Sequence, residues 1–181
     1  MKKIAFAGMV SALALGCSVN VYAQTGKVTA DGDIIVTATR TETLLSKTPI
    51  AITAVTGDQL VQKGITNTTQ LADSVPNVSI VRGNGLQITI RGVTSTDGTE
   101  KGDPSAAFMS DGVYIARQQA QEVSFYDISR VEVLRGPQGT LYGRNSTAGV
   151  VNVISARPKF EMGASVDASY ASFKTINATA A

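Results

Sequence analysis

The segment Val150–Ile154 reads Val-Val-Asn-Val-Ile and predicts a β-strand that is buried on both faces. A strand with one wet face is expected to alternate apolar and polar residues, whereas a short and nearly continuous apolar run fits a strand covered on both sides. The chain must therefore place a layer of other elements on each side of this strand.

Two short helices are predicted before the first long strands. Thr56 and Gln59 have the spacing of a capping box, and Gly64 is a suitable end for the helix that follows them. A second helix is expected to begin at Asn67 and to stop before Pro76, because the residue before a proline is disfavoured in helical conformation.

The remaining predicted elements are strands, joined by turns that draw on the 17 glycines of the chain. Arg82–Gly85 is expected to form a hairpin turn. Helices and strands alternate without a regular βαβ rhythm, so the prediction is an α+β domain with a mixed, mostly four-stranded sheet and short helices. Besides Val150–Ile154, the predicted strands are Val78–Val81, Leu86–Ile90, Phe108–Ile115 and Ile128–Arg135.

The composition excludes several classes of function. The chain has no histidine, so it cannot contain a Ser/His/Asp relay, an imidazole base or a histidine-ligated zinc. A net charge of +2 is far from the basic character of a nucleic-acid-binding domain. We therefore expect no enzyme, no cofactor, no metal site and no nucleic-acid partner.

The N-terminal residues 1–23 have the pattern of a secretory signal peptide. Lys2 and Lys3 precede the apolar run Ile4–Leu15, and Ala23 is a suitable cleavage position. Removing this segment removes the net charge of +2 and the single cysteine, Cys17. An alternative is lipid attachment at Cys17, which a mass measurement of the mature N-terminus would detect. Either interpretation takes the chain out of the cytoplasm.

Residues 24–40 are expected to form a flexible tether that carries a short extended segment. Gln24–Asp33 is small and polar, whereas the following Ile34–Val36 is β-branched. An isolated strand of this length either joins the sheet of its own domain or offers its backbone to a partner by strand addition.

The C-terminal residues 159–181 change in character. Ala164–Tyr170 and Thr175–Ala180 alternate apolar and polar residues, which is typical of strands of a transmembrane β-barrel. An ordinary half-buried hairpin is the alternative. Because the second strand reaches the end of the sequence, we expect the chain to be part of a longer protein.

Several segments together resemble the TonB-dependent outer-membrane receptors. The resemblance covers residues 33–181, in the order and spacing of that family, and implies a plug domain at 41–158 followed by the first strands of a barrel. Its segments are Asp33–Arg40, Thr48–Ile52, Leu71–Val78, Ile88–Val93, Asp111–Tyr114 and the most specific run, Ile128–Ile154.

The resemblance also implies three groups of functional residues. The TonB box is expected at Asp33, Ile34, Ile35, Val36, Thr37 and Ala38. Ion pairing between plug and barrel is expected at Arg91, Glu132 and Arg135, with solvated strand-end charges as the plainer alternative. Ligand-sensing loops are expected at Arg82, Gly83, Asn84 and Gly85 and at Thr94, Ser95, Thr96 and Asp97; the latter loop does not have the spacing of a calcium site.

The function implied by the resemblance is energy-coupled uptake of a scarce ligand across the bacterial outer membrane. The expected partners are TonB with ExbB and ExbD, the outer membrane and an extracellular ligand. The resemblance makes a ferric siderophore the leading ligand, with cobalamin and an oligosaccharide as the alternatives. If iron is the cargo, a mature chain without His or Cys should receive it already bound in an organic chelator. A different class of function is a free periplasmic module that binds TonB without transport.

Overall fold

A computed structural model describes residues 33–97, 99, 102–158, 166–171 and 175–180. The chain divides into two units, of which the larger spans Gln24–Phe160 and the smaller includes Glu161–Ala181.

The larger unit is built on a five-stranded sheet with the order β3-β8-β9-β6-β7. Strand β6 runs parallel to β9 and the other neighbours are antiparallel, so the sheet is mixed, as predicted. Four strands are full length and β7 has only two residues. The strands are β3 (Ile52–Thr56), β6 (Ala106–Ser110), β7 (Val113–Tyr114), β8 (Ile128–Arg135) and β9 (Gly149–Ser155).

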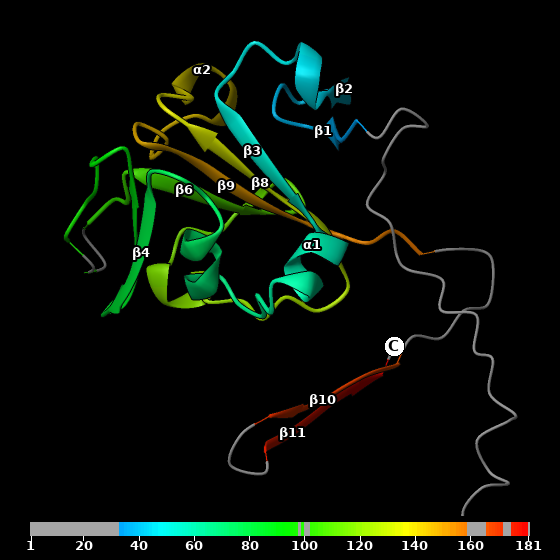
Figure 1. Ribbon diagram of the computed structural model, residues 1–181. Coiled ribbons are helices and arrows are strands. Elements are labelled where there is room, and N and C mark those ends of the chain that lie inside the picture. The colour runs from blue at the N-terminus through cyan, green and yellow to red at the C-terminus, as the bar shows by residue number, and fades with distance from the viewer. Residues whose placement is uncertain (1–32, 98, 100–101, 159–165, 172–174, 181) are drawn as a thin grey trace, which may run out of the picture. The chain divides into compact units, whose positions relative to one another are not determined.

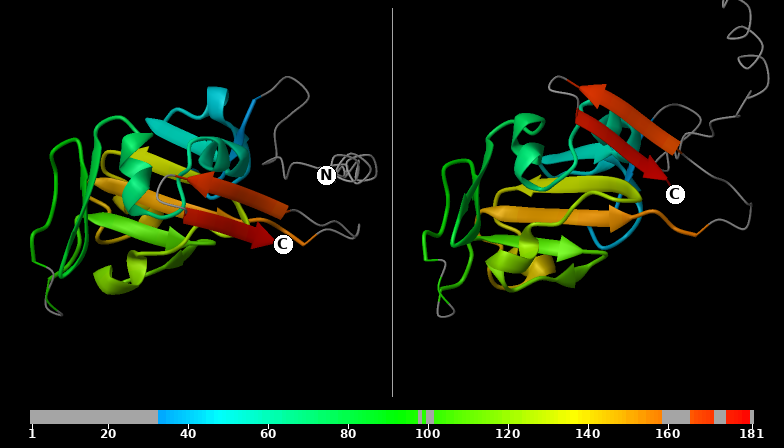
Figure 2. Two further views of the ribbon diagram at one scale, coloured as in Figure 1. Left: turned by 60° about the horizontal axis from the view of Figure 1, so that its bottom comes forward. Right: turned by 90° about the horizontal axis from the view of Figure 1, so that it is seen from below.

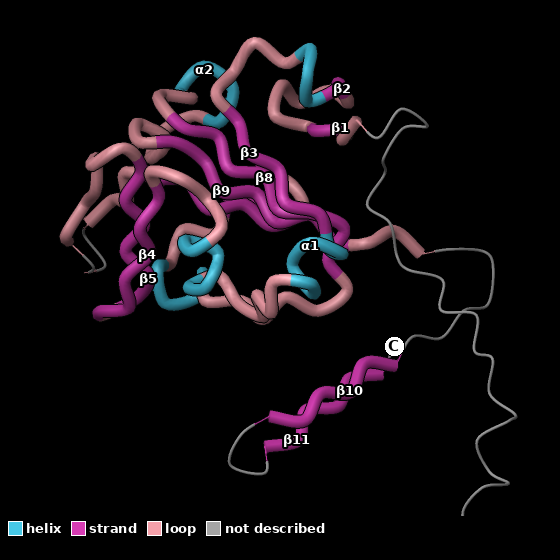
Figure 3. Tube along the Cα trace, viewed as in Figure 1, coloured by secondary structure: helices cyan, strands magenta, loops and turns pink. Residues whose placement is uncertain are grey.

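Both faces of the central strands are covered, which confirms the prediction made from Val150–Ile154. One face carries the side chains of Val131, Val133 and Val151, in a cluster that includes the helical residues Leu60 and Leu71. The opposite face carries a second cluster, whose buried members are Val36, Ala38, Ala54, Ala107, Met109, Leu134 and Val150. Figures 1 and 3 show helix α1 on one side of the sheet, and strand β1 with helix α2 on the other.

The helices are short. The two predicted helices form, although the second begins at Thr69 and not at Asn67. Helix α1 (Gly57–Gln62) has the complete capping box of Thr56 and Gln59. The second predicted helix forms as the 3₁₀ helix η2 (Thr69–Asp73), and Oδ1 of Asn67 accepts a hydrogen bond from the amide of Gln70. The remaining helices are η1 (Leu45–Lys47), η3 (Gln118–Gln121) and α2 (Gly139–Tyr142).

Strands β4 (Val78–Gly83) and β5 (Gly85–Ile90) form a separate hairpin. The predicted four-residue turn is tighter than expected, because Arg82 pairs with Leu86 and Gly83 pairs with Gly85, which leaves Asn84 at the tip. Figure 2 shows this hairpin at one end of the main sheet, away from the N-terminal strand β1.

The predicted strand Phe108–Ile115 is wrong in one respect. The chain turns at Asp111 and Gly112, whose φ angles are 49° and 81°, so that β6 and β7 form a hairpin. Asp-Gly is a preferred pair for such a turn, because both central residues need positive φ.

In the smaller unit, β10 (Val166–Ala171) and β11 (Thr175–Ala180) pair antiparallel, from Val166 opposite Ala180 to Ala171 opposite Thr175. The predicted hairpin is thus confirmed. The predicted signal peptide and residues 24–32 lie outside the described residues. Within the part of the chain that the structure describes, no helix is both long and apolar enough to cross a membrane.

Candidate functional site

The segment Asp33–Ala38 packs against the rest of the larger unit. Its strand β1 (Ile35–Val36) pairs antiparallel with β2 (Thr43–Leu44), and the amide of Leu45 donates to the carbonyl oxygen of Ile34 at 2.8 Å. Of the two possibilities for this segment, pairing within its own domain is the one observed. One edge of the segment is therefore covered by β2.

The other edge of the segment is occupied at Thr37. The amide nitrogen of Thr37 lies 2.8 Å from Oε1 of Glu132, and the Thr37 hydroxyl lies 3.2 and 3.3 Å from the two carboxylate oxygens. The Glu132 side chain is fully buried and also accepts from Nε of Arg130 at 2.7 Å. Charge-assisted hydrogen bonds of this kind are stronger than neutral ones.

Tyr142, at the end of α2, contacts the residues that follow Thr37 in the chain. Its hydroxyl donates to the carbonyl oxygen of Ala38 at 3.2 Å, and its ring lies beneath the guanidinium of Arg40, 4.6 Å from the ring centroid. Burial raises the pKa of Tyr142, and the nearby Glu132 charge raises it further, while Arg40 lowers it. The hydroxyl therefore keeps its proton at neutral pH.

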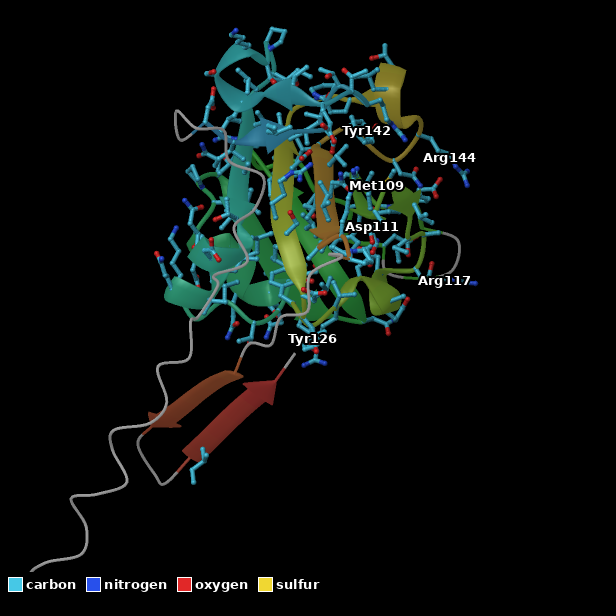
Figure 4. The ribbon with its side chains drawn as sticks, turned by 90° about the vertical axis from the view of Figure 1, so that its right-hand side faces the viewer. Met109, Asp111, Arg117, Tyr126, Tyr142 and Arg144 are labelled. Carbon is cyan, nitrogen blue, oxygen red and sulfur yellow. The ribbon has the colours of Figure 1, made fainter. Side chains whose placement is uncertain are left out.

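Side-chain packing completes the docking. Val36 and Ala38 are fully buried and belong to the same cluster as Met109 and Leu134. Figure 4 shows Tyr142 and Met109 on the face of the sheet that β1 crosses. Segment 33–38 is thus a component of the folded domain.

The predicted ion-pairing residues divide into two groups. Nη1 of Arg91 lies 3.4 Å from the place that a Cβ would take at Gly136, the residue after Arg135. Neither arginine forms an ion pair with another described residue, and Nε of Arg135 is buried without a partner among them. Glu132 lies apart, with Arg130 and Thr37. The arginines present positive charge, whereas the glutamate is neutralised within the chain.

The first predicted ligand loop, Arg82–Gly85, is held by η3. Arg82 forms an ion pair with Glu122 at 2.7 Å, and Nε2 of Gln119 donates to the carbonyl oxygen of Asn84 at 2.8 Å. Gly85 lies so close to Gln118 that a side chain there would clash with it. The tip of the β4–β5 hairpin is therefore held in place by η3 and the residue that follows it.

The second predicted ligand loop, Thr94–Asp97, is exposed over most of its length. Nε2 of Gln87 donates to the carbonyl oxygen of Thr96 at 3.3 Å, which connects the loop to the β4–β5 hairpin. Hydrogen bonds from Thr99 lower the pKa of Asp97. No cluster of acidic residues fit for a metal ion occurs among the described residues.

Sequence reasoning missed Tyr142, Arg130 and the strand Thr43–Leu44 as parts of this site. The pattern of β8 held one usable signal, since Arg130, Glu132 and Leu134 alternate with valines and so share a face. No comparable pattern marks Tyr142.

The sequence comparison decides the family. The family described as TonB-dependent Receptor Plug Domain matches residues 45–150. The chain belongs to this family. The pesticin receptor of Yersinia pestis is 31% identical over 71% of this chain and 19% of the receptor. The vitamin B12 transporter of Vibrio vulnificus is 29% identical over 80% of this chain and 24% of the transporter.

Among solved structures, the plug is similar to part of the ferric yersiniabactin uptake receptor of Yersinia pestis, with a TM-score of 0.59 and 27% identity. That match covers 68% of this chain and 19% of the receptor. The chain thus spans about a fifth of the length of the relatives it matches. Its family consists of receptors and transporters of the bacterial outer membrane, which places this plug there.

Proposed function

We propose that this chain is the plug portion of a receptor for energy-coupled uptake of a ferric siderophore, and that Asp33–Ala38 is its TonB box. The observation that carries the proposal is the extended, β-branched segment that precedes the family-matched region 45–150. A strand of this kind can be recognised through its backbone by strand addition.

The proposed mechanism begins with force on the N-terminal segment. TonB, energised by ExbB and ExbD, adds a strand to the box and pulls, and a ladder of backbone hydrogen bonds resists the load. The box connects through β2 and η1 to β3, which pairs with β8 and with no other strand among the described residues. Force on the box therefore reaches an edge strand before the central strands, and a path for the ligand opens where local stability is lowest.

The two arginines beside Gly136 are proposed to anchor the plug in its barrel. Neither Arg91 nor Arg135 forms an ion pair with a carboxylate among the described residues. Arginine suits paired recognition of carboxylates, because its planar fork donates two parallel hydrogen bonds. Acidic residues of a barrel wall are the proposed partners. Glu132 has a different role, because Thr37 and Arg130 already use its carboxylate.

The ligand is proposed to reach the plug as a complete iron chelate. The ferric yersiniabactin receptor is among the similar structures, and the plug offers neither His nor Cys beyond the predicted leader. The loops Arg82–Gly85 and Thr94–Asp97 are the proposed contact surface. Binding of ferric yersiniabactin, cobalamin and a maltooligosaccharide by the receptor separates the ligand classes; binding of cobalamin or sugar alone would contradict the siderophore.

The TonB box is tested by Ile35→Pro, with Ile35→Val as the matched control. Proline removes one backbone donor and fixes φ, so it interrupts strand addition, whereas valine preserves the backbone. We expect the C-terminal domain of TonB to capture the Val variant and to lose the Pro variant. Normal capture of Ile35→Pro would contradict the proposed box. TonB capture without any ligand uptake would favour a binding module.

A further inference from the structure

We propose that Glu132 is a latch that closes the free edge of the TonB box, so that docking of the box and strand addition by TonB exclude each other. This inference rests on the proposed function of Asp33–Ala38. It assigns a regulatory role to the buried pair of Glu132 and Arg130.

The two edges of the segment have different occupants. In an antiparallel strand, successive residues direct their backbone groups to opposite edges. The carbonyl oxygen of Ile34 accepts from Leu45, so the even-numbered residues of β1 face β2. Ile35 and Thr37 consequently face the other edge, which is the edge left for an incoming strand.

Both backbone groups of Thr37 are already used, the amide on that edge and the carbonyl oxygen in the turn that follows the segment. Its amide donates to Glu132 at 2.8 Å, and its carbonyl oxygen accepts from the amide of Arg40 at 2.9 Å. A ladder advances by two residues, so a strand that pairs at Ile35 must pair next at Thr37. There it meets the carboxylate of Glu132. The docked box therefore cannot be extended into a ladder.

The polar groups beneath the segment favour the closed state. Glu132 has two acceptor oxygens, and its neighbour on β9, Asn152, has a buried side-chain oxygen without a donor among the described residues. Arg130 supplies one donor to Glu132, while Thr37 supplies two, its amide and its hydroxyl. When Thr37 leaves, the buried carboxylate loses two of these three donors.

The latch is reinforced by Tyr142. Tyr142 donates to the carbonyl oxygen of Ala38, and Arg130 gives Glu132 a partner that does not belong to the box. Glu132 is a positioning residue that acts on the box.

The first measurement is amide hydrogen exchange of residues 33–40 in the full receptor. Thr37→Val keeps the shape of the side chain and leaves the Glu132–Arg130 pair intact, and Glu132→Gln removes the charge. Because a hydrogen bond to a charged group is worth about a tenfold factor or more, we expect the backbone amide at position 37 to exchange about 10-fold faster in either variant. Asp73→Asn, an exposed carboxylate on η2, is the control and should leave it unchanged.

The second measurement is capture of the TonB C-terminal domain by the same receptors. A larger accessible fraction of the box lowers the apparent dissociation constant in proportion, so both latch variants should bind several-fold more tightly than the unmodified receptor. Protection of the β8 amides checks that the sheet is folded. Thr37→Val, which leaves the buried charges paired, decides the result if Glu132→Gln unfolds.

The two measurements separate the latch from the proposed function. Unchanged exchange in Thr37→Val would overturn the latch, whatever TonB does. Faster exchange without tighter capture would overturn mutual exclusion, provided that the unmodified receptor captures TonB and Ile35→Pro does not. If no receptor captures TonB, the TonB box is wrong, whereas the latch stands on the exchange data.

Discussion

The amide of Thr37 donates a 2.8 Å hydrogen bond to the buried carboxylate of Glu132, although the two residues are 95 positions apart in the sequence. This bond joins the segment before the plug to the middle of strand β8. It also places the negative charge of Glu132 beneath this segment, and the ion-pair partner of that charge is Arg130. The stability of the plug and the position of its N-terminal segment therefore depend on the same carboxylate.

Replacing Glu132 by Ala is expected to destabilise the larger unit strongly. The change leaves the guanidinium of Arg130 without its carboxylate, and breaking one side of a buried pair lowers the free energy of unfolding by about 3–5 kcal/mol. Urea denaturation measures this loss.

The double variant Arg130→Met/Glu132→Leu is the matched control for that prediction. Because it removes both charges and fills the space with apolar side chains, we expect a free energy of unfolding within about 1–2 kcal/mol of the original protein. A similar loss in both variants would show that shape, and not the charge pair, sets the stability.

Tyr142 is expected to make the docking of segment 33–40 sensitive to alkaline pH. Burial raises its pKa above the ordinary value of 10.0, so the folded state holds the phenolic proton more tightly than the unfolded state does. The stabilisation is complete below about pH 10 and is lost as pH rises through the folded pKa. Exchange of amides 33–40 against pH should show this loss, and Tyr142→Phe should remove its pH dependence. An identical profile in the Phe variant would contradict the assignment.

The sequence predicted those features that depend on neighbouring residues. The capping box of Thr56 and Gln59, the hairpin around Asn84 and the doubly covered strand at Val150–Ile154 all formed. The turn at Asp111–Gly112 was also encoded locally. It was missed because the apolar residues on its two sides read as one strand.

The docked site could not be predicted in the same way. Glu132 was grouped with Arg91 and Arg135 because each of these charged residues lies within an apolar strand or at its end. Their partners are set by which face of the sheet each side chain takes and by a segment distant in sequence. Thr37, Tyr142 and Glu132 converge only once the sheet has formed, so no spacing in the sequence reports their contact.

The capping box offers a test of local stability. In α1, the hydroxyl of Thr56 accepts from the amide of Gln59, and the Gln59 side chain accepts from the amide of Thr56. Thr56→Ala leaves one amide of the first turn without its acceptor, and we expect the free energy of unfolding to fall by about 1 kcal/mol. Thr56→Ser, which keeps the hydroxyl, should retain most of the stability; an equal loss in Ser would point to packing of the methyl group.

Gly149, at the start of β9, is expected to be among the least replaceable residues of the sheet. Its φ is 154°, and a Cβ there would overlap the carbonyl oxygen of Leu134 on β8 and the side chain of Ile90. Because the obstacle is backbone of a central strand, it cannot move without separating β8 from β9. We expect Gly149→Ala to lower the free energy of unfolding by about 2–3 kcal/mol. Gly83→Ala is the matched control, since a Cβ at Gly83 meets nothing within 4 Å. Denaturation of the two variants in parallel tests the prediction, and equal stabilities would show that the β8–β9 contact can relax.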